Sequence, residues 1–270
     1  MSVDEERRAL QGKSALVCGA TRGIGRACAR EFARLGARVT LLARSAEGLR
    51  EAAEELAAAG RGEGLAHDVL RADFDDFALV QRVVSERIAG GEGFQILLNN
   101  SGGPPGGALL DAEPESFLKA FRRHLICNHV LAKLLVPGMK QAGYGRIVNI
   151  VSTSVKQPIP GLGVSNTIRA AVASWAKTLS AELAPFGITV NNVLPGATRT
   201  DRLLQIIRER ARASGRGEKE IEEEMKRDIP AGRFGEAEEI AAAAGFLTLP
   251  ASGYINGISL AVDGGRTTAL

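Results

Sequence analysis

The chain has few cysteines, few tyrosines and no cluster of potential metal ligands. Its three cysteines, Cys18, Cys28 and Cys127, lie in apolar surroundings, which favours reduced, buried thiols over a disulfide framework. No cysteine pair has metal-ligand spacing and the three histidines do not cluster with acids, so we expect no metal site. Only two tyrosines are present, Tyr144 and Tyr254, which limits the choice of a phenolic proton donor.

Long hydrophobic runs and a dominant charge are also missing. No apolar run approaches the roughly 18 residues that cross a bilayer, and residues 1–10 are rich in Asp, Glu and Arg, unlike a signal peptide. Lys plus Arg is 34 and Asp plus Glu is 31, so the net charge is only +3. This balance gives no reason to expect a nucleic-acid partner. We expect a cytoplasmic protein with neither membrane nor nucleic-acid contacts.

Short runs of Val, Leu and Ile alternate with longer Ala-rich helical patterns, as in repeated βαβ units. Near-continuous apolar strands indicate a sheet buried on both faces. The pattern predicts one α/β domain over residues 1–270, Rossmann-type and doubly wound, with a mostly parallel seven-stranded sheet and helices on both faces. The expected strands cover residues 14–18, 38–42, 64–67, 96–98, 146–151, 189–194 and 258–262, the third ending at Asp68-Val69.

Three segments lie outside this rhythm. Residues 1–11 form an N-terminal extension, and residues 102–107 form a Gly- and Pro-rich loop after the fourth strand. Residues 202–228 follow the sixth strand and predict two helices around Gly215 and Gly217. Open α/β sheets bind ligands beyond the carboxyl ends of their strands, so we expect 202–228 to be a substrate lid. The alternative is a simple surface insertion.

A Gly-rich turn lies between the first strand and the first helix, the setting in which such turns bind phosphate. Gly19 permits a tight turn, Gly23 lets the backbone approach a pyrophosphate and Gly25 allows close helix–strand packing. The helix start then presents free N–H groups to the anion. The expected dinucleotide contacts in this turn are Gly19, Thr21, Arg22, Gly23, Ile24 and Gly25.

The charge near the expected ribose indicates which dinucleotide binds. An NAD site usually has an acid at the end of the second strand, but here that end carries Arg44 and no acid. Arg22 adds a second guanidinium, and guanidinium groups match phosphate oxygens. We therefore predict NADP(H), against the alternative that both arginines merely face water.

The Gly19–Gly25 turn, the sequence Asn99-Asn100-Ser101-Gly102 and Ser152 together resemble the short-chain dehydrogenase/reductase family over nearly the whole chain. Within it, Arg233-Phe234-Gly235 and the segment 253–257 are most similar to 3-oxoacyl-acyl-carrier-protein reductases. The resemblance implies that Asp68-Val69 lies against the adenine and that Asn100 supports the ribose, while Asn99 is structural. It also implies further contacts beside the nicotinamide from Pro195, Gly196, Thr198 and Thr200.

The resemblance fails at the catalytic positions. Ser152 matches the family serine that positions the carbonyl, but the tyrosine thirteen residues later is Ser165 and the following lysine is Arg169. The family asparagine falls on His124, with Asn128 one turn later as a substitute if the helix shifts. A serine hydroxyl is a far weaker acid than a tuned tyrosine, and arginine keeps its charge.

Neither tyrosine of the chain has the spacing to replace the missing one. Lys156, four residues after Ser152, is a candidate acid or anion ligand, although a surface lysine is the default interpretation. We expect Lys156 or His124 to contact substrate.

These features support an NADP(H)-dependent oxidoreductase for a small-molecule or acyl-thioester carbonyl, with an atypical proton donor. The alternatives are a catalytically impaired NADP(H)-binding protein, acting as a sensor or partner subunit, and another reaction on the same scaffold, such as an isomerisation or elimination. Small and apolar residues in the expected helices 117–135 and 166–183, together with the resemblance, imply a homodimer or homotetramer.

Overall fold

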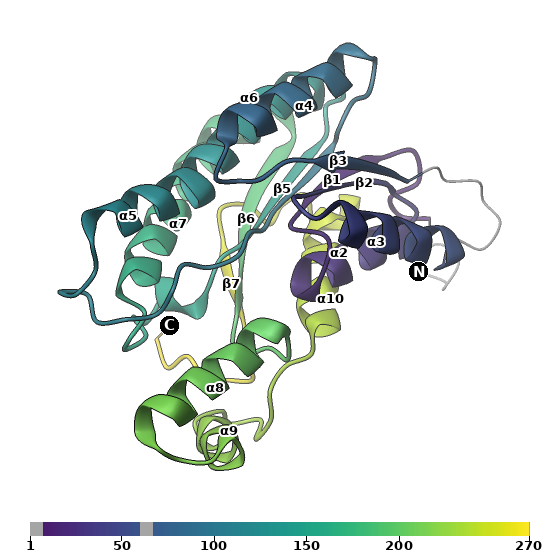
Figure 1. Ribbon diagram of the computed structural model, residues 1–270. Coiled ribbons are helices and arrows are strands. Elements are labelled where there is room, and N and C mark those ends of the chain that lie inside the picture. The colour runs from purple at the N-terminus through teal and green to yellow at the C-terminus, as the bar shows by residue number, and fades with distance from the viewer. Residues whose placement is uncertain (1–7, 60–66, 270) are drawn as a thin grey trace.

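The computed structural model describes residues 8–59 and 67–269. Seven parallel strands form one sheet in the order β3-β2-β1-β4-β5-β6-β7 (Figure 1). This order reverses direction at β1, as in a doubly wound Rossmann fold, so the predicted fold class is confirmed. The strands are β1 (Ser14–Cys18), β2 (Arg38–Ala43), β3 (Asp68–Arg71), β4 (Ile96–Asn99), β5 (Gly145–Ile150), β6 (Ile188–Pro195) and β7 (Ser259–Val262).

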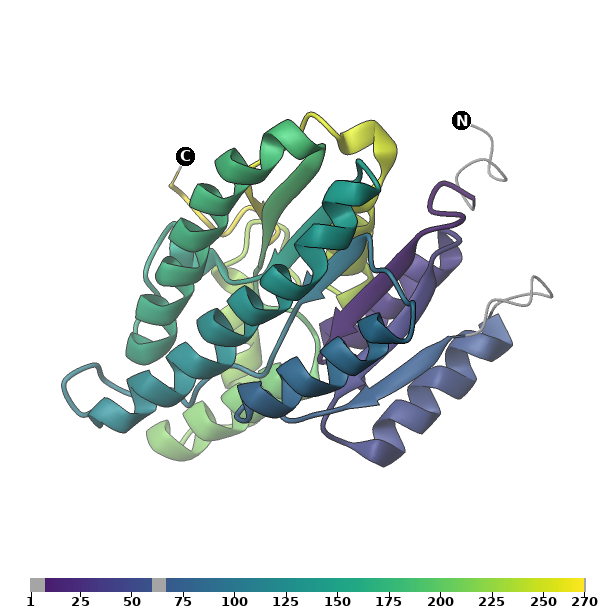
Figure 2. The same ribbon diagram turned by 90° about the horizontal axis from the view of Figure 1, so that it is seen from above.

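Helices cover both faces of the sheet (Figures 1 and 2). Alternate residues of a strand point to opposite faces, and β1 shows the consequence: Ala15 and Val17 belong to one buried cluster, Leu16 and Cys18 to the other. The first cluster includes α2 (Gly23–Arg34), α3 (Ala46–Ala59) and α10 (Ala237–Thr248). The second includes α4 (Phe77–Ala89), α6 (Cys127–Gln141) and α7 (Gly163–Leu183).

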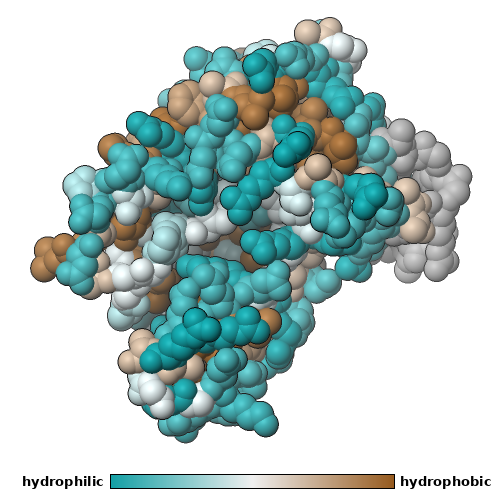
Figure 3. Space-filling view, in the orientation of Figure 1, coloured by the Kyte–Doolittle hydropathy of each residue, from teal (hydrophilic) through white to brown (hydrophobic). Residues whose placement is uncertain are grey.

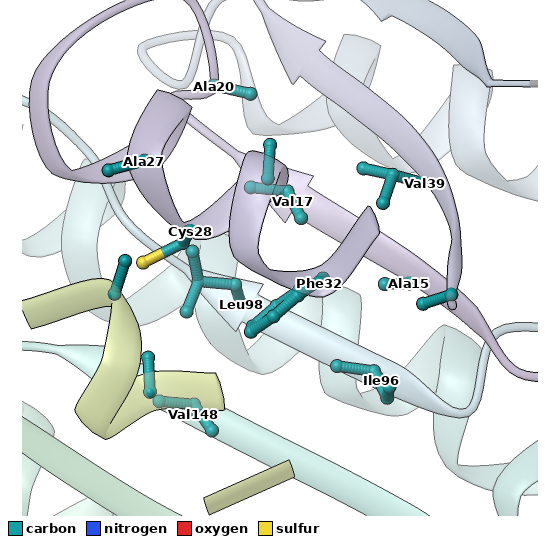
Figure 4. Close-up of a cluster of buried hydrophobic side chains, with 14 of the residues drawn as sticks. Ala15, Val17, Ala20, Ala27, Cys28, Phe32, Val39, Ile96, Leu98 and Val148 are labelled. Atoms are coloured by element: carbon teal, nitrogen blue, oxygen red, sulfur yellow. The ribbon is translucent and has the colours of Figure 1, made fainter. Parts of the chain in front are cut away.

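The α2 face of the core is closely packed (Figure 4). Phe32 lies against the strands, and Cys28 faces the sheet near Val148 and Leu98. All three cysteines are buried and free, as the sequence predicts. Burial raises the pKa of the Cys127 thiol to about 12, so it stays protonated and behaves as a small apolar side chain.

The third strand is the one strand that the sequence misplaces. It runs over Asp68–Arg71, whereas we expected residues 64–67, of which 64–66 lie outside the described residues. Asp68 therefore begins the strand, beside Thr40, and binds Arg87 of α4. The prediction that Asp68-Val69 ends this strand is wrong. Asp73 and Phe74 instead follow its carboxyl end.

Buried side-chain amides join the four neighbouring strands β4, β5, β6 and β7. The Asn99 amide donates to Asn149 at 2.9 Å, Asn149 donates to Asn192 at 3.0 Å, and Asn192 donates to Ser259 at 3.1 Å. These residues face one another in the register of β4, β5, β6 and β7. Because the bonds tie each strand to the next, the structural role expected for Asn99 is confirmed.

Two irregular regions lie around the carboxyl edge of the sheet. A helix α5 (Pro114–Phe121) joins α6 through a π turn at Arg122–Ile126. After β6, α8 (Asp201–Ser214) and α9 (Glu218–Arg227) form a separate lobe in Figure 1. Its small core contains Leu203, Ile207 and Met225 among others. The two helices expected around Gly215 and Gly217 are confirmed.

The start of the described chain is anchored to the sheet layer. Leu10 is fully buried and its backbone N–H donates to the Leu35 carbonyl at 2.8 Å, while residues 1–7 of the expected extension lie outside the described residues. Among the described helices, none combines the length and apolar character that a membrane span requires.

Candidate functional site

Most of the segments that carry the expected site residues meet at the carboxyl edge of the sheet. The Gly-rich turn follows β1, the loop 100–107 follows β4, Ser152 follows β5, and residues 196–200 follow β6. Figure 3 shows a recess between the α8–α9 lobe and the rest of the molecule, with mostly hydrophilic residues on its visible walls. Ligands of open α/β sheets bind at this edge.

The Gly-rich turn has little room for side chains. Gly19 and Gly23 have φ angles of +62° and +53°, a region that favours glycine. A Cβ on Gly25 would lie 2.2 Å from the Gly19 carbonyl oxygen, so no side chain fits there without moving the backbone. The Asn100 amide donates to the Cys18 carbonyl at 3.2 Å and thereby links the turn to the end of β4.

The start of α2 is suited to an anion. Its N-cap, Arg22, makes no side-chain capping bond, and the first turn holds no acid. Its backbone N–H groups are therefore left without a side-chain partner, as at a phosphate site. A Cβ on Gly23 would lie 3.3 Å from the Thr200 methyl group, which places the segment after β6 beside the same turn. These features fit the diphosphate of a dinucleotide.

Arginines surround the end where the adenosine ribose of such a dinucleotide would lie. Arg44 follows β2, and its carbonyl accepts a bond from the Arg71 guanidinium at 3.2 Å. The Arg44 and Arg22 side chains are 68% and 72% exposed and form only long ion pairs, with Asp73 at 3.8 Å and Asp201 at 3.6 Å. Exposed pairs of this kind contribute little stability, so both guanidinium groups can turn to a phosphate.

The displaced third strand changes one part of the expected cofactor site. Asp68 and Val69 lie at the amino end of β3, away from the Gly-rich turn, so they cannot take the expected place beside the adenine. The Ala72 N–H donates to the Ala43 carbonyl at 3.0 Å, which brings Asp73 to the carboxyl edge next to Arg44. Sequence reasoning missed Asp73 because the strand was shifted by several residues.

His124 lies in the π turn between α5 and α6, a local feature that often marks functional sites. It is 5% exposed, one ring nitrogen (Nδ1) lies 2.9 Å from the Ser101 hydroxyl, and the other (Nε2) has no hydrogen-bond partner. Asn128 lines the same small cavity. The π turn adds a residue to the helix and so shifts the residues that follow it. With that shift, the His124 and Asn128 side chains line one cavity.

Burial, and then the charges of Arg169 and Arg123, lower the pKa of His124 to about 3. The imidazole is therefore neutral at physiological pH. It can hold a hydrogen bond to Ser101 or to a ligand, but it does not carry the proton that an imidazolium acid would donate.

Ser165 and Arg169 lie one turn apart in α7. Ser165 is 8% exposed, and the partly buried Arg169 guanidinium donates to the Ile150 carbonyl at 3.2 Å. Burial, followed by the charge of Arg202, lowers the pKa of Arg169 to about 10, so it remains a cation at neutral pH. Arg169 lines the cavity of His124, whereas Ser165 does not.

Ser152 and Lys156 lie in the segment that follows β5. The Ser152 hydroxyl accepts the Ser154 N–H at 3.1 Å and so begins the short helix Thr153–Val155. Lys156 follows that helix, partly buried. Two further neighbours were missed by sequence reasoning: Ser101 on His124, and Arg202, whose guanidinium donates to the Pro104 carbonyl at 3.1 Å. Both lie in segments that the sequence analysis singled out, but their partners lie far away in sequence.

Comparison with known proteins places this geometry in a family. Residues 19–267 match a family model described as enoyl-(acyl carrier protein) reductase. The chain belongs to the short-chain dehydrogenase/reductase family. It is 34% identical to the 3-oxoacyl-[acyl-carrier-protein] reductase FabG of Haemophilus influenzae, over 95% of this chain and 98% of that protein. It is 31% identical to human dehydrogenase/reductase SDR family member 4, over 98% and 91% of the two chains.

Solved structures of the family superpose closely. YwfH, an NADPH-dependent reductase involved in bacilysin biosynthesis, has a TM-score of 0.89 at 28% identity, covering 96% of this chain and 99% of its own. L-Sorbose reductase from Gluconobacter frateurii, solved with NADPH and L-sorbose, has a TM-score of 0.88 at 30% identity, covering 98% and 100%. The cofactor of both agrees with the NADP(H) expected from Arg22 and Arg44.

Proposed function

We propose that the protein is an NADP(H)-dependent oxidoreductase that interconverts a carbonyl and a hydroxyl group without a tyrosine acid. The observation that carries this proposal is the uncapped start of α2 together with the exposed Arg22 and Arg44. Ser152 follows β5 at the same carboxyl edge of the sheet. When bound, NADPH supplies the hydride; the protein supplies position and charge.

The side chains suggest how the site works without the family tyrosine. The Ser152 hydroxyl would bind the carbonyl oxygen, and the Arg169 cation would stabilise negative charge that develops there. With His124 neutral, the proton would come from Lys156 or from water ordered by the Ser152 and Ser165 hydroxyls. Loss of a well-placed general acid costs about 10²- to 10⁴-fold in rate and still leaves a working reaction.

A substrate panel tests the proposal. Purified protein is mixed with NADPH and a set of ketones, 2- and 3-oxo acids and 3-oxoacyl thioesters, and NADPH oxidation is followed by absorbance. We expect oxidation with at least one carbonyl compound, at a rate that falls at least tenfold in Ser152→Ala because the carbonyl loses its hydrogen bond. NADPH binding without oxidation across the panel would favour the alternative, a nucleotide-binding protein without reductase activity. The replacement of the family tyrosine and lysine by Ser165 and Arg169 is also consistent with that alternative.

The two arginines predict the choice of nucleotide. Arg44→Ala should weaken NADPH binding by roughly 10- to 100-fold, because a charge-assisted bond to the 2′-phosphate is lost. NADH, which lacks that phosphate, should bind within about threefold of its wild-type affinity. Calorimetry on the wild type, Arg44→Ala and the exposed α4 control Arg82→Ala measures both affinities. Equal losses for NADPH and NADH would contradict the assignment of Arg44 to the phosphate.

We also propose that the protein assembles as a homodimer or homotetramer. Leu118 and Phe121 of α5 are 49% and 38% exposed, and Ala170 of the neighbouring α7 is exposed as well. Large exposed apolar side chains next to small ones suit a helix-to-helix contact between identical subunits.

A further inference from the structure

Two guanidinium groups from distant parts of the chain lie against consecutive residues of the loop after β4. Arg202, on the second residue of α8, donates to the Pro104 carbonyl at 3.1 Å. Arg169, on α7, reaches the preceding residue: its terminal nitrogen lies 3.5 Å from where a Cβ of Gly103 would be. The lobe and the sheet body thus each contribute one cation to the same spot, next to His124.

These two cations have no acidic partner. Within residues 8–59 and 67–269, neither Arg169 nor Arg202 takes part in an ion pair; Arg169 binds the Ile150 carbonyl, and Arg202 binds the Pro104 carbonyl and the Gln205 side chain. The charge of Arg202 also acts unfavourably on that of Arg169. By contrast, many other arginines of the described chain form ion pairs, such as Arg123 with Asp75 and Arg233 with Glu239.

Two partly buried like charges repel each other, and an anion bound between them would offset that repulsion. A carboxylate matches the planar fork of each guanidinium and can accept two parallel bonds from one of them. The neutral His124 imidazole lines the same small cavity as Arg169 and offers a further polar group there.

We propose that Arg169 and Arg202 bind a carboxylate carried by the substrate, so that the reaction acts on small oxo acids and their hydroxy-acid products. This inference rests on the proposed carbonyl–hydroxyl reaction for the substrate's reacting group, but the anion site is independent of turnover. Arg169 donates to the Ile150 carbonyl, two residues before Ser152, so a substrate with its carboxylate a few bonds from its carbonyl suits the two groups. Closure of α8 over such a substrate would follow from the same contact, since Arg202 is part of that helix.

The test measures binding to the complex of the protein with NADP⁺, which cannot transfer a hydride to a ketone. The probes are 2-oxobutanoate, 2-oxohexanoate and 3-oxohexanoate, each compared with its methyl ester by calorimetry. We expect at least one acid to bind at least tenfold more tightly than its ester. In Arg202→Gln that advantage should fall to less than threefold. Arg212→Gln, the matched loss of an exposed arginine ten residues along α8, should keep it.

The outcomes separate this inference from its rivals. If no acid is preferred over its ester, or if Arg202→Gln retains the preference, the carboxylate site is wrong. If Arg202→Gln instead weakens NADP⁺ binding at least tenfold and leaves the acid-to-ester ratio unchanged, Arg202 belongs to the nucleotide site and the inference is overturned. If acids bind as expected but NADPH is never oxidised by any of them, the carboxylate site stands and the proposed reaction fails.

Discussion

Replacing His124 with asparagine is expected to flatten the acid side of the protein's stability curve. Burial, and then the charges of Arg169 and Arg123, lower the pKa of this imidazole from 6.5 to about 3. Below pH 6.5 the unfolded chain therefore binds a proton that the native chain refuses, so His124 makes folding less favourable as the pH falls toward 3. The cost is about 1.4 kcal/mol for each pH unit in that window. Asparagine does not titrate and carries no such cost.

Urea unfolding of the wild type and His124→Asn at pH 7.5, 6.5, 5.5 and 4.5 measures this effect. From pH 7.5 to 4.5 the wild type should lose about 2 to 3 kcal/mol more unfolding free energy than the variant. A loss of packing or of the Ser101 contact would lower the unfolding free energy of the variant equally at every pH. The slope of unfolding free energy against pH therefore reports the titration of His124 alone. Parallel curves for the wild type and His124→Asn would show that the buried imidazole accepts a proton in the native state.

The sheet could be predicted from sequence because its strands are buried on both faces. In β1, β4, β5 and β6 every or nearly every residue is buried, and such continuous apolar runs are the strongest strand signal. β3 lacks that signal: its residues alternate between partly buried and exposed, with Asp68 and Arg71 at its ends. The apolar residues that precede it were therefore taken for the strand, so the residues expected at its carboxyl end, Asp68 and Val69, lie at its amino end instead.

The site divides in the same way. The Gly-rich turn and Arg44 could be placed because they lie within a few residues of a strand end, where local sequence determines position. The pairing of Arg169 with Arg202 could not be predicted from sequence. The two residues come near each other only because α8 packs against the loop after β4. Likewise, sequence spacing indicated that His124 replaces an asparagine, but only the packing of the π turn shows that its imidazole is buried and neutral.

Gly25→Ala should strongly weaken nucleotide binding, although it adds only one methyl group. The new Cβ would lie 2.2 Å from the Gly19 carbonyl oxygen and 2.6 Å from the Asn100 amide nitrogen, so the turn and the end of β4 must move apart. Overpacking of this kind costs about 1 to 3 kcal/mol of unfolding free energy. Displacement of the turn also moves the N–H groups at the start of α2, so we expect NADPH affinity to fall at least 100-fold.

Gly138→Ala is the matched control, since Gly138 lies within α6 and nothing would lie within 4 Å of its added Cβ. Alanine favours a helix over glycine, so this variant should gain about 0.5 to 1 kcal/mol and bind NADPH as the wild type does. Urea unfolding gives the stabilities, and calorimetry gives the affinities for both variants. Gly25 lies between the turn and Asn100, so its substitution should change the nucleotide site directly. We therefore expect the loss of NADPH affinity to exceed what the loss of unfolding free energy alone would cause. A folded Gly25→Ala protein that binds NADPH within threefold of the wild type would show that the nucleotide does not rest on this turn.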